Sequence, residues 1–255
     1  MLLTIDVGNT QTHVGAFDGS NLVEHWRFAT EREVTGDQLA MTVRELLALS
    51  GIELAAVHAE AISCVVPRLV PEYRHMFQRY LDRDPFVVGP GTKTGMPIRL
   101  DNPRELGADR LVNAVAGYDR CRDACVIVDF GTAITYDAVS AEGEYLGGII
   151  TPGIEISMEA LTSRAARLPK VDIEEPKALI GKTTDGSIRS GIVYGFAGQV
   201  DGICRRLRGE LGDGITTIAT GGLASVIVGF TETIDDVDDL LTLKGLKLIH
   251  ERNRQ

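Results

Sequence analysis

The sequence predicts an α/β fold made of two similar halves, and three observations lead to this prediction. The chain begins with an apolar run that ends at Asp6, passes through a glycine, an amide and a hydroxyl residue, and returns to a strand pattern. The same order recurs at Asp129, about half of the chain length further on. After each aspartate, helical periodicity alternates with strand patterns.

The first half starts with a hairpin at Asp6, and an alternating pattern over residues 21–29 predicts a third strand. Thr35 is a suitable N-cap for a helix ending near Ser50 and Gly51, because its side chain can accept a hydrogen bond from the first helical turn. Apolar spacing then predicts a strand at 60–66, a helix around 73–80, a short strand at 84–88 and a helix at 105–116.

The second half repeats this order. Strand patterns at 125–129, 133–139 and 145–150 precede a helix beyond Gly153, a helix at about 187–211, a strand at 215–220, a short helix, an acidic run at 235–239 and a last helix at 240–250. We place the domain boundary in the polar stretch 118–123. This gives an N-terminal domain at 1–118 and a C-terminal domain at 119–255.

Three meandering strands followed by alternating helices and strands are the layout of a ribonuclease H-like domain. Two such domains face each other in the actin-like ATPase and sugar-kinase superfamily. The predicted fold is therefore a duplicated ribonuclease H-like α/β fold with an active-site cleft between the domains. Since one fold can support many functions, the chemistry has to be inferred from particular residues.

Composition excludes several classes of protein. The net charge is −10 and the sequence pI is about 5.0. An acidic chain without a basic stripe argues against a nucleic-acid partner, because phosphate neutralisation needs clustered Lys and Arg. No apolar run approaches the roughly 18 residues of a membrane span, so we expect no membrane partner and a cytoplasmic protein. The four cysteines lack the spacing of a metal–thiolate site.

Both hairpins have the composition of a phosphate-binding turn. Glycine lets the backbone approach a ligand closely, and successive N–H groups in a tight turn can form a concave anion site. Asp6 would supply charge for a cation that accompanies the phosphates. The alternative is an ordinary hairpin with a polar turn, and the second copy at Asp129 favours the phosphate interpretation.

Asp109 and Arg110 lie where a loop meets a predicted helix. Asp109 could accept the proton of an attacking hydroxyl, and Arg110 could hold a carboxylate or phosphate through two hydrogen bonds. The alternative is a surface pair, because adjacent residues of a helix do not face each other. The glycine-rich strand end at 147–153 could face an anion, and the one at 219–222 could face a nucleoside. The alternative for both is close packing of a strand and a helix.

Together, these motifs resemble the type III pantothenate kinases of bacteria. The resemblance covers nearly the whole chain, and the motifs follow in the order of that family. They are Asp6-Val7-Gly8-Asn9-Thr10, Asn102-Pro103, Gly107-Ala108-Asp109-Arg110, Asp129-Phe130-Gly131-Thr132-Ala133, the segments 147–153 and 181–184, Ser190-Gly191 and Thr220-Gly221-Gly222.

The resemblance implies a homodimeric kinase that uses ATP to phosphorylate the primary hydroxyl of pantothenate, the first step of coenzyme A biosynthesis. It implies that the base is Asp109, that a monovalent cation (K⁺ or ammonium) lies at Asp129, and that Asp6 holds Mg²⁺ through the phosphates. Pantothenate would contact Gly107, Ala108, Asp109, Arg110 and Thr184. ATP would contact Asp6, Val7, Gly8, Asn9, Thr10, Gln11, Thr12, His13 and Thr132.

The sequence departs from the family at Leu100, where the family usually has an aromatic residue before Asp-Asn-Pro. We therefore expect an effect on pantothenate affinity but not on the class of reaction. Two alternatives are a non-catalytic regulatory protein on the same scaffold and a kinase for another small hydroxylated substrate. The presence of Asp6, Asp109 and Asp129 argues against the first, and a substrate panel would test the second.

Overall fold

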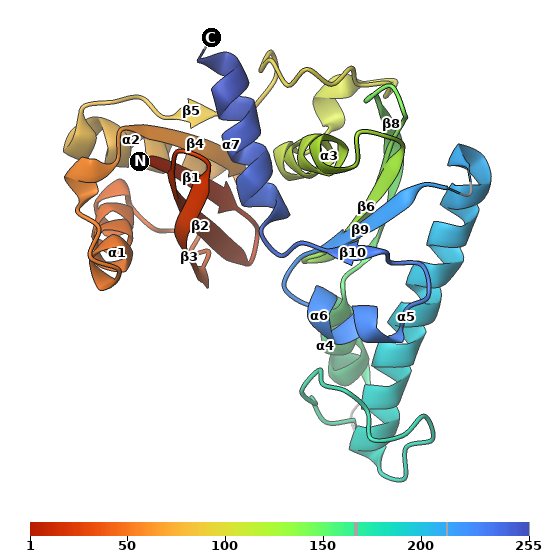
Figure 1. The fold of residues 1–255 in the computed structure, drawn as a ribbon. Helices are drawn as coiled ribbons and strands as arrows, with labels where there is room; N and C mark the ends of the chain where they lie inside the picture. Colours follow the sequence, from red (N-terminus) through yellow and green to blue (C-terminus); the bar gives the residue numbers. More distant parts are fainter. Residues whose placement is uncertain (166–167, 213, 255) are drawn as a thin grey trace. The chain divides into compact units, whose positions relative to one another are not determined.

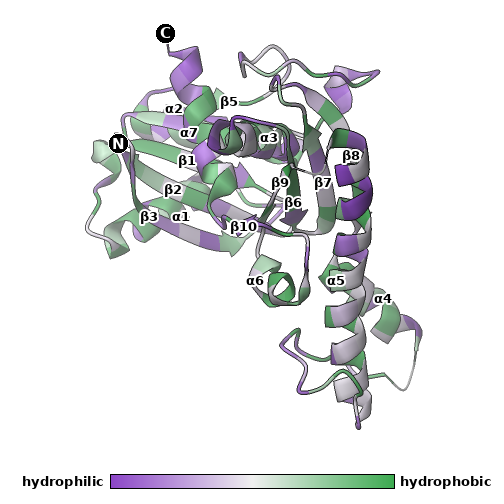
Figure 2. Cartoon of the chain, turned by 45° about the vertical axis from the view of Figure 1, so that its right-hand side comes forward, coloured by the Kyte–Doolittle hydropathy of each residue, from purple (hydrophilic) through white to green (hydrophobic). Residues whose placement is uncertain are grey.

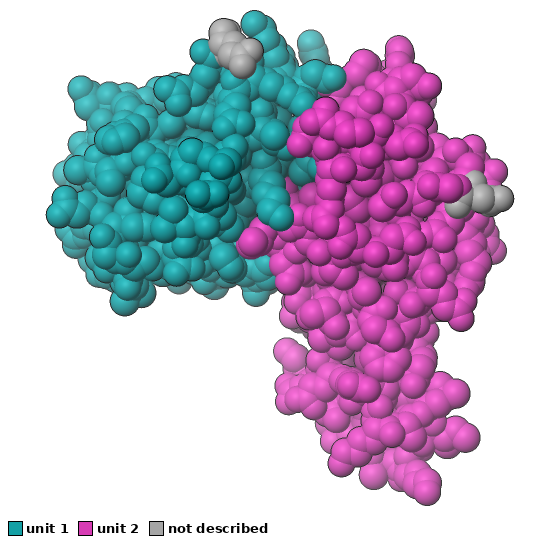
Figure 3. All heavy atoms as spheres, in the orientation of Figure 1, with its two compact units in different colours: residues 1–95, 104–116, 242–255 teal, residues 96–103, 117–241 magenta. Residues whose placement is uncertain are grey.

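The structure is a computed structural model that describes residues 1–165, 168–212 and 214–254. The chain forms two compact units, which have different colours in Figure 3. Unit 1 contains residues 1–95, 104–116 and 242–255, and unit 2 contains residues 96–103 and 117–241. Each unit is therefore built from separate stretches of chain. The predicted boundary between residues 118 and 119 stays a prediction.

The elements follow the predicted order (Figure 1). Unit 1 holds β1 (Leu2–Val7), β2 (Gln11–Asp18), β3 (Asn21–Ala29), α1 (Gly36–Leu49), β4 (Ala59–Cys64), α2 (Val70–Leu81), β5 (Phe86–Val87), the first part of α3 (Ala108–Cys121) and nearly all of α7 (Leu241–Asn253). Unit 2 holds β6 (Cys125–Phe130), β7 (Ala133–Val139), β8 (Tyr145–Pro152), α4 (Ile154–Arg164), α5 (Thr184–Leu211), β9 (Thr216–Thr220), α6 (Ala224–Ile227) and β10 (Asp236–Val237). Short 3-10 helices lie at Leu54–Ala56, Pro67–Leu69, Pro103–Glu105 and Val228–Phe230.

The two sheets have the same topology. Among the described residues each sheet has five strands, in the order β3-β2-β1-β4-β5 in unit 1 and β8-β7-β6-β9-β10 in unit 2. In each sheet the first three strands are antiparallel, and the last two are parallel to the central strand or to its neighbour. This repeat confirms the predicted duplication of a ribonuclease H-like fold.

The duplication extends to single residues. Asp6 on β1 is paired with His13 on β2 and with Ser63 on β4. Asp129 on β6 is paired with Thr135 on β7 and with Thr220 on β9. Each aspartate thus lies near the carboxyl end of the central strand, beside a hydroxyl residue of the parallel neighbour.

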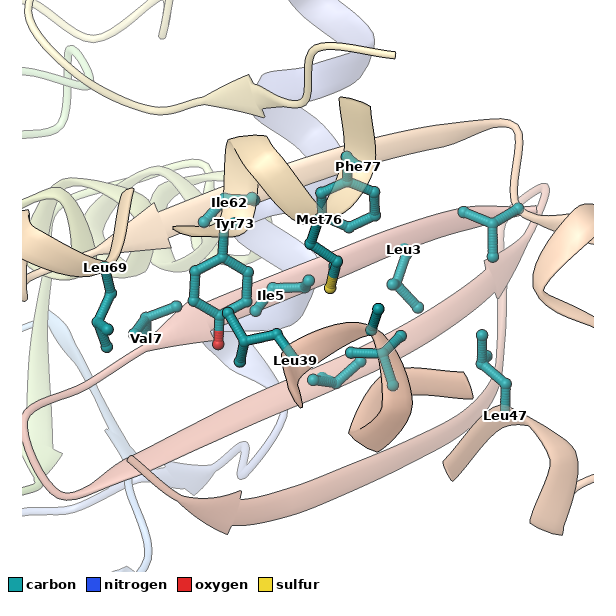
Figure 4. Close-up of a cluster of buried hydrophobic side chains, with 14 of the residues drawn as sticks. Leu3, Ile5, Val7, Leu39, Leu47, Ile62, Leu69, Tyr73, Met76 and Phe77 are labelled. Atoms are coloured by element: carbon teal, nitrogen blue, oxygen red, sulfur yellow. The ribbon is translucent and has the colours of Figure 1, made fainter. Parts of the chain in front are cut away.

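In unit 1 the central strand buries one face against α1 and α2. Figure 4 shows Leu3, Ile5 and Val7 of β1 pointing toward apolar side chains of the two helices. The N-terminus of α1 is fixed by a capping box, in which the predicted N-cap Thr35 exchanges hydrogen bonds with Gln38. The opposite face is covered near β2 by α7, because a Cβ atom at Gly15 would lie 2.9 Å from Leu243 Cδ1.

In unit 2 the apolar face of the sheet packs on α5. Val126 and Val128 of β6 share a buried cluster with Val193 and Val200 of the helix. The other face of α5 is polar or glycine-rich and is drawn mostly in pale and purple shades in Figure 2. The helix therefore buries a single stripe of its surface within this unit.

Three predicted elements differ from the observed ones. The helix predicted at 105–116 is α3, which starts three residues later and continues to Cys121, so the start of the polar stretch 118–123 is helical. The helix predicted from residue 187 starts at Thr184. The acidic run contains β10, a two-residue strand that extends the second sheet beside β9. No helix in the described ranges has both the length and the apolar character needed to span a membrane.

Candidate active site

The Asp6 hairpin is a tight turn of the expected kind. The N–H of Gly8 donates a hydrogen bond to the carbonyl oxygen of Gln11 at 3.0 Å. A Cβ atom at Gly8 would lie 2.8 Å from that same oxygen, so a side chain at this position would push the turn apart. Asn9, Thr10 and Gln11 are exposed at the tip of the turn, where a ligand could reach their backbone.

Side chains of this segment point to both faces of the sheet. Asp6 and His13 are partners across the ladder and therefore lie on one face. Thr12 lies on the other face, where it is 1% exposed and its hydroxyl is 2.9 Å from that of Thr30. Val7 is buried in the core beside it. Of the predicted phosphate ligands, Val7 and Thr12 can therefore offer only backbone atoms to a ligand above the Asp6 face.

His13 is held in its neutral form. Burial, the positive charge of Arg27 and the neighbouring His25 lower the pKa of His13 to about 3. Its Nε2 atom lies 3.2 Å from Nδ1 of His25 on β3. His13 is therefore a polar but uncharged group beside Asp6.

The Asp129 hairpin has a similar turn. The N–H of Gly131 donates to the carbonyl oxygen of Ala133 at 3.2 Å. Directly after β9, Gly221 has a φ of +96°, and a Cβ atom there would lie 2.5 Å from Oδ1 of Asp129. The glycine after Thr220 therefore allows close approach to Asp129, a role that the sequence interpretation of this strand end did not include.

The N-terminus of α4 lies against the same turn. A Cβ atom at Gly153 would lie only 2.2 Å from the carbonyl oxygen of Thr132 and 2.7 Å from that of Gly131. Gly153 is the N-cap of α4, and no side chain caps the helix there. Because the first N–H groups of a helix are free to bind an anion, the turn at Thr132 and the start of α4 can together face a phosphate group.

Asp109 lies in the first turn of α3. Its Oδ1 atom accepts a hydrogen bond from the backbone N–H of Arg110 at 2.8 Å. Burial raises the pKa of Asp109, and this hydrogen bond and the charge of Arg110 oppose the rise. A Cβ atom at Gly107 would lie 2.5 Å from Oδ1 of Asp109, so the glycine leaves room for the carboxylate. The net result is a carboxylate that is more basic than an ordinary aspartate.

Thr184 is the first residue of α5 and is exposed. It lines an open depression of about 840 Å³ in unit 2. The floor and walls of this depression are formed by Leu161, Leu168, Gly181, Lys182, Thr183, Thr184, Ser187, Ile188, Gly191 and Ile192. The structure therefore places Thr184 in a hollow that can take a small molecule.

Leu100 lies beside the glycine-rich strand β8. Residue 98 pairs with Tyr145, and a Cβ atom at Gly147 would lie 3.6 Å from Cδ2 of Leu100. Gly147 has a φ of +139°, a value that favours glycine. A side chain at position 147 would therefore contact Leu100, the residue at which the sequence departs from the family pattern.

The predicted site residues fall in both units. Asp6, His13, Asp109 and Arg110 belong to unit 1 with the rest of segments 6–13 and 107–110, whereas Asp129, Thr132 and Thr184 belong to unit 2. Sequence reasoning missed Ser63 and His25. Ser63 is fully buried next to Asp6 and could have been found from its place near the end of the predicted strand 60–66.

Both aspartates have the oxygen-rich surroundings that hard cations prefer. Asp129 has Thr135 and Thr220 as its partners in the sheet, and Asp6 has Ser63. Within the described part of the chain, no group of three or more His, Cys, Asp or Glu side chains is arranged to hold a metal ion alone. These sites therefore fit a cation that is also bound by phosphate oxygens or water.

Comparison with known proteins gives consistent results. Residues 2–206 match the family model described as "Type III pantothenate kinase". A relative of that name from Anaeromyxobacter sp. (strain K) is 53% identical over 254 residues and covers 100% of both chains.

Two solved structures are similar in fold. A putative Baf family transcriptional activator from Campylobacter jejuni has a TM-score of 0.60 and 18% identity, covering 99% of this chain and 98% of the other. A ROK hexokinase from Thermus thermophilus has a TM-score of 0.53 and 14% identity, covering 100% and 99%. These likenesses show the fold alone.

Proposed function

Because the chain belongs to the type III pantothenate kinase family, we propose that it transfers the γ-phosphoryl group of ATP to the primary hydroxyl of pantothenate, the first step of coenzyme A biosynthesis. One observation supports this reaction most directly. Asp6 and Asp129 occupy the same position in two sheets of the same topology, and each is followed by a glycine turn. Phosphoryl transfer depends mainly on positioning and charge neutralisation, which such turns can provide.

In this proposal the ATP phosphates bind to the backbone of the Asp6 turn, with Thr132 and the N-terminus of α4 as a second anion site. Asp6 would hold Mg²⁺ through the phosphates. Asp129 would hold K⁺ or ammonium, with the hydroxyl groups of Thr135 and Thr220 as further oxygen ligands. These cations would offset the negative charge of the phosphates.

Asp109 is the proposed base. A carboxylate with a raised pKa is better matched to accepting a proton from a hydroxyl than an ordinary aspartate is. Arg110 would pair with the carboxylate of pantothenate through two hydrogen bonds. Thr184, in its open depression, would contribute a further contact to the substrate.

We also propose that the enzyme is a homodimer in the cytoplasm, and the surface of α5 supports the dimer. Gly191, Gly195, Gly198 and Gly202 lie along one face of this helix, and a glycine inside a helix costs about 1 kcal/mol relative to alanine. At the first three, an added Cβ atom would meet no described atom within 4 Å, so packing inside this chain does not explain them. Close contact with a second copy of the chain would explain these glycines.

The test is direct. Purified, folded protein is incubated with ATP, Mg²⁺, K⁺ and pantothenate, and phosphopantothenate is measured. Absence of product would overturn the proposal, and turnover of another hydroxylated acid in place of pantothenate would correct the substrate. For the dimer, Gly195→Leu should shift the mass in light scattering toward the monomer, whereas a wild-type protein of 27.6 kDa in solution would refute the dimer.

A further inference from the structure

Two histidines face each other on β2 and β3, the last two strands at one edge of the first sheet. Nε2 of His13 on β2 lies 3.2 Å from Nδ1 of His25 on β3, and the two rings are 5.3 Å apart at an angle of 70°. In the ladder His13 is paired with Arg27, and His25 with Gly15, so the histidines are diagonal neighbours on one face. The two imidazole nitrogens therefore lie within hydrogen-bond distance of each other.

The distance between these nitrogens is close to that in a zinc site. Zn–N bonds are about 2.0–2.1 Å long, so two nitrogens of one tetrahedral ion lie about 3.4 Å apart. A shared hydrogen lies nearly on the line between the nitrogens, whereas a metal ion lies to one side of it. Each ring would have to turn by roughly 30° to bring both lone pairs onto the ion, and exposed His25 is free to do so.

The local charges also permit a cation. A neutral imidazole offers a lone pair to a metal ion. Arg27 opposes a cation here. Asp6, the partner of His13 in the other ladder, places one carboxylate on the same face of the sheet and offsets this charge. Imidazole is a preferred ligand of zinc, copper and nickel, not of Mg²⁺ or K⁺.

We propose that His13 and His25 together bind one zinc ion, with water completing its coordination. Since His13 ends the segment proposed to bind the ATP phosphates, a bound zinc ion would turn its ring toward β3 and lower the affinity for ATP. This second step rests on the proposed function, whereas binding of the metal does not.

The binding experiment uses the full-length protein after treatment with a chelator, titrated with Zn²⁺ against a chromophoric competitor. We expect one equivalent for the wild type and at least a tenfold loss of affinity in both His25→Gln and His13→Gln. His58→Gln removes an exposed imidazole at a distant position of the same unit and should bind like the wild type. Absence of binding in the wild type, or wild-type affinity in the His25 and His13 variants, would overturn the inference.

The kinetic experiment separates this inference from the proposed function. At a buffered concentration of free Zn²⁺ we expect the KM for ATP of the wild type to rise, and to return to its metal-free value when chelator is added. For His25→Gln, the KM for ATP with and without Zn²⁺ is compared in the same way. We expect the Zn²⁺-induced increase in this variant to be at least tenfold smaller than in the wild type. A protein that binds zinc but never phosphorylates pantothenate would contradict the proposed function alone. An active protein with no zinc site would contradict this inference alone.

Discussion

Replacing Gly153 by alanine tests whether the turn at Thr132 and the start of α4 form part of the ATP site. The added Cβ atom would lie 2.2 Å from the carbonyl oxygen of Thr132, and real Cβ contacts do not fall below 3.0 Å. The turn and the helix must therefore separate by about 0.8 Å, the difference between these distances. A displacement of about 1 Å near reacting groups can cost roughly 10²-fold in rate.

The assay compares kcat/KM for ATP in Gly153→Ala and in Gly229→Ala, a matched control in the same unit whose added Cβ atom would meet nothing within 4 Å. We expect a loss of about 10²-fold in the first variant and little change in the second. Alanine is also a poor N-cap, which lowers the unfolding free energy by about 1 kcal/mol beyond the cost of the steric overlap, so a melting curve first establishes that the variant is folded. Normal kcat/KM in folded Gly153→Ala would refute the reasoning.

Three further predictions concern single side chains. Asp109→Asn should lower turnover by about 10²-fold or more. The melting temperature of this variant at pH 7 should stay the same or rise. The pKa of Asp109 is higher in the folded than in the unfolded state, so ionisation of Asp109 lowers the stability of the wild type as pH increases, and asparagine cannot ionise. A large fall in melting temperature would instead show that Asp109 has a structural role. Tyr145→Phe removes the 2.7 Å hydrogen bond to buried Asp137 and should cost about 2 kcal/mol, or roughly 5 °C in a melting curve, and an unchanged curve would contradict this. Asp129→Asn should abolish stimulation by K⁺ while the protein stays folded, and turnover that still depends on K⁺ would exclude Asp129 as the cation ligand.

The sequence was most informative where local pattern and tertiary structure agree. The two hairpins at Asp6 and Asp129 were predicted because their glycine turns and flanking strands are encoded within a few residues. The capping box at Thr35 was predictable for the same reason. These features also define the duplicated topology, because the remaining helices and strands follow each hairpin in the same order.

The acidic run could not be interpreted from local sequence. Its carboxylates are paired with arginines that are distant in the chain. Arg120 at the end of α3 forms ion pairs with Asp236 and Asp238, and Arg208 on α5 pairs with Asp235 at 2.8 Å. Neutralised in this way, the run can add the short strand β10 to the edge of the sheet, although Asp is rarely found in strands.

Distant contacts also explain what was missed at the candidate site. His25 stands beside His13 only because β2 and β3 pair in one particular register. Ser63 is brought next to Asp6 by a parallel pairing whose two strands are separated by α1. The role of Gly221 depends on its approach to Asp129 across β6 and β9. In each case the functional information lies in strand register, which the residue pattern alone did not specify.

The position of α7 has a consequence for the order in which the protein can mature. Leu243, Leu246 and Ile249 are completely buried, and Leu243 covers Gly15 of the second strand. The residues that cover this face of the first sheet are thus synthesised only after unit 2. While the ribosome is still translating unit 2, α7 is absent and this face of the first sheet stays exposed. Unit 1 therefore cannot finish folding before unit 2 has been translated. A nascent chain released before α7 should expose this surface and be recognised as incomplete.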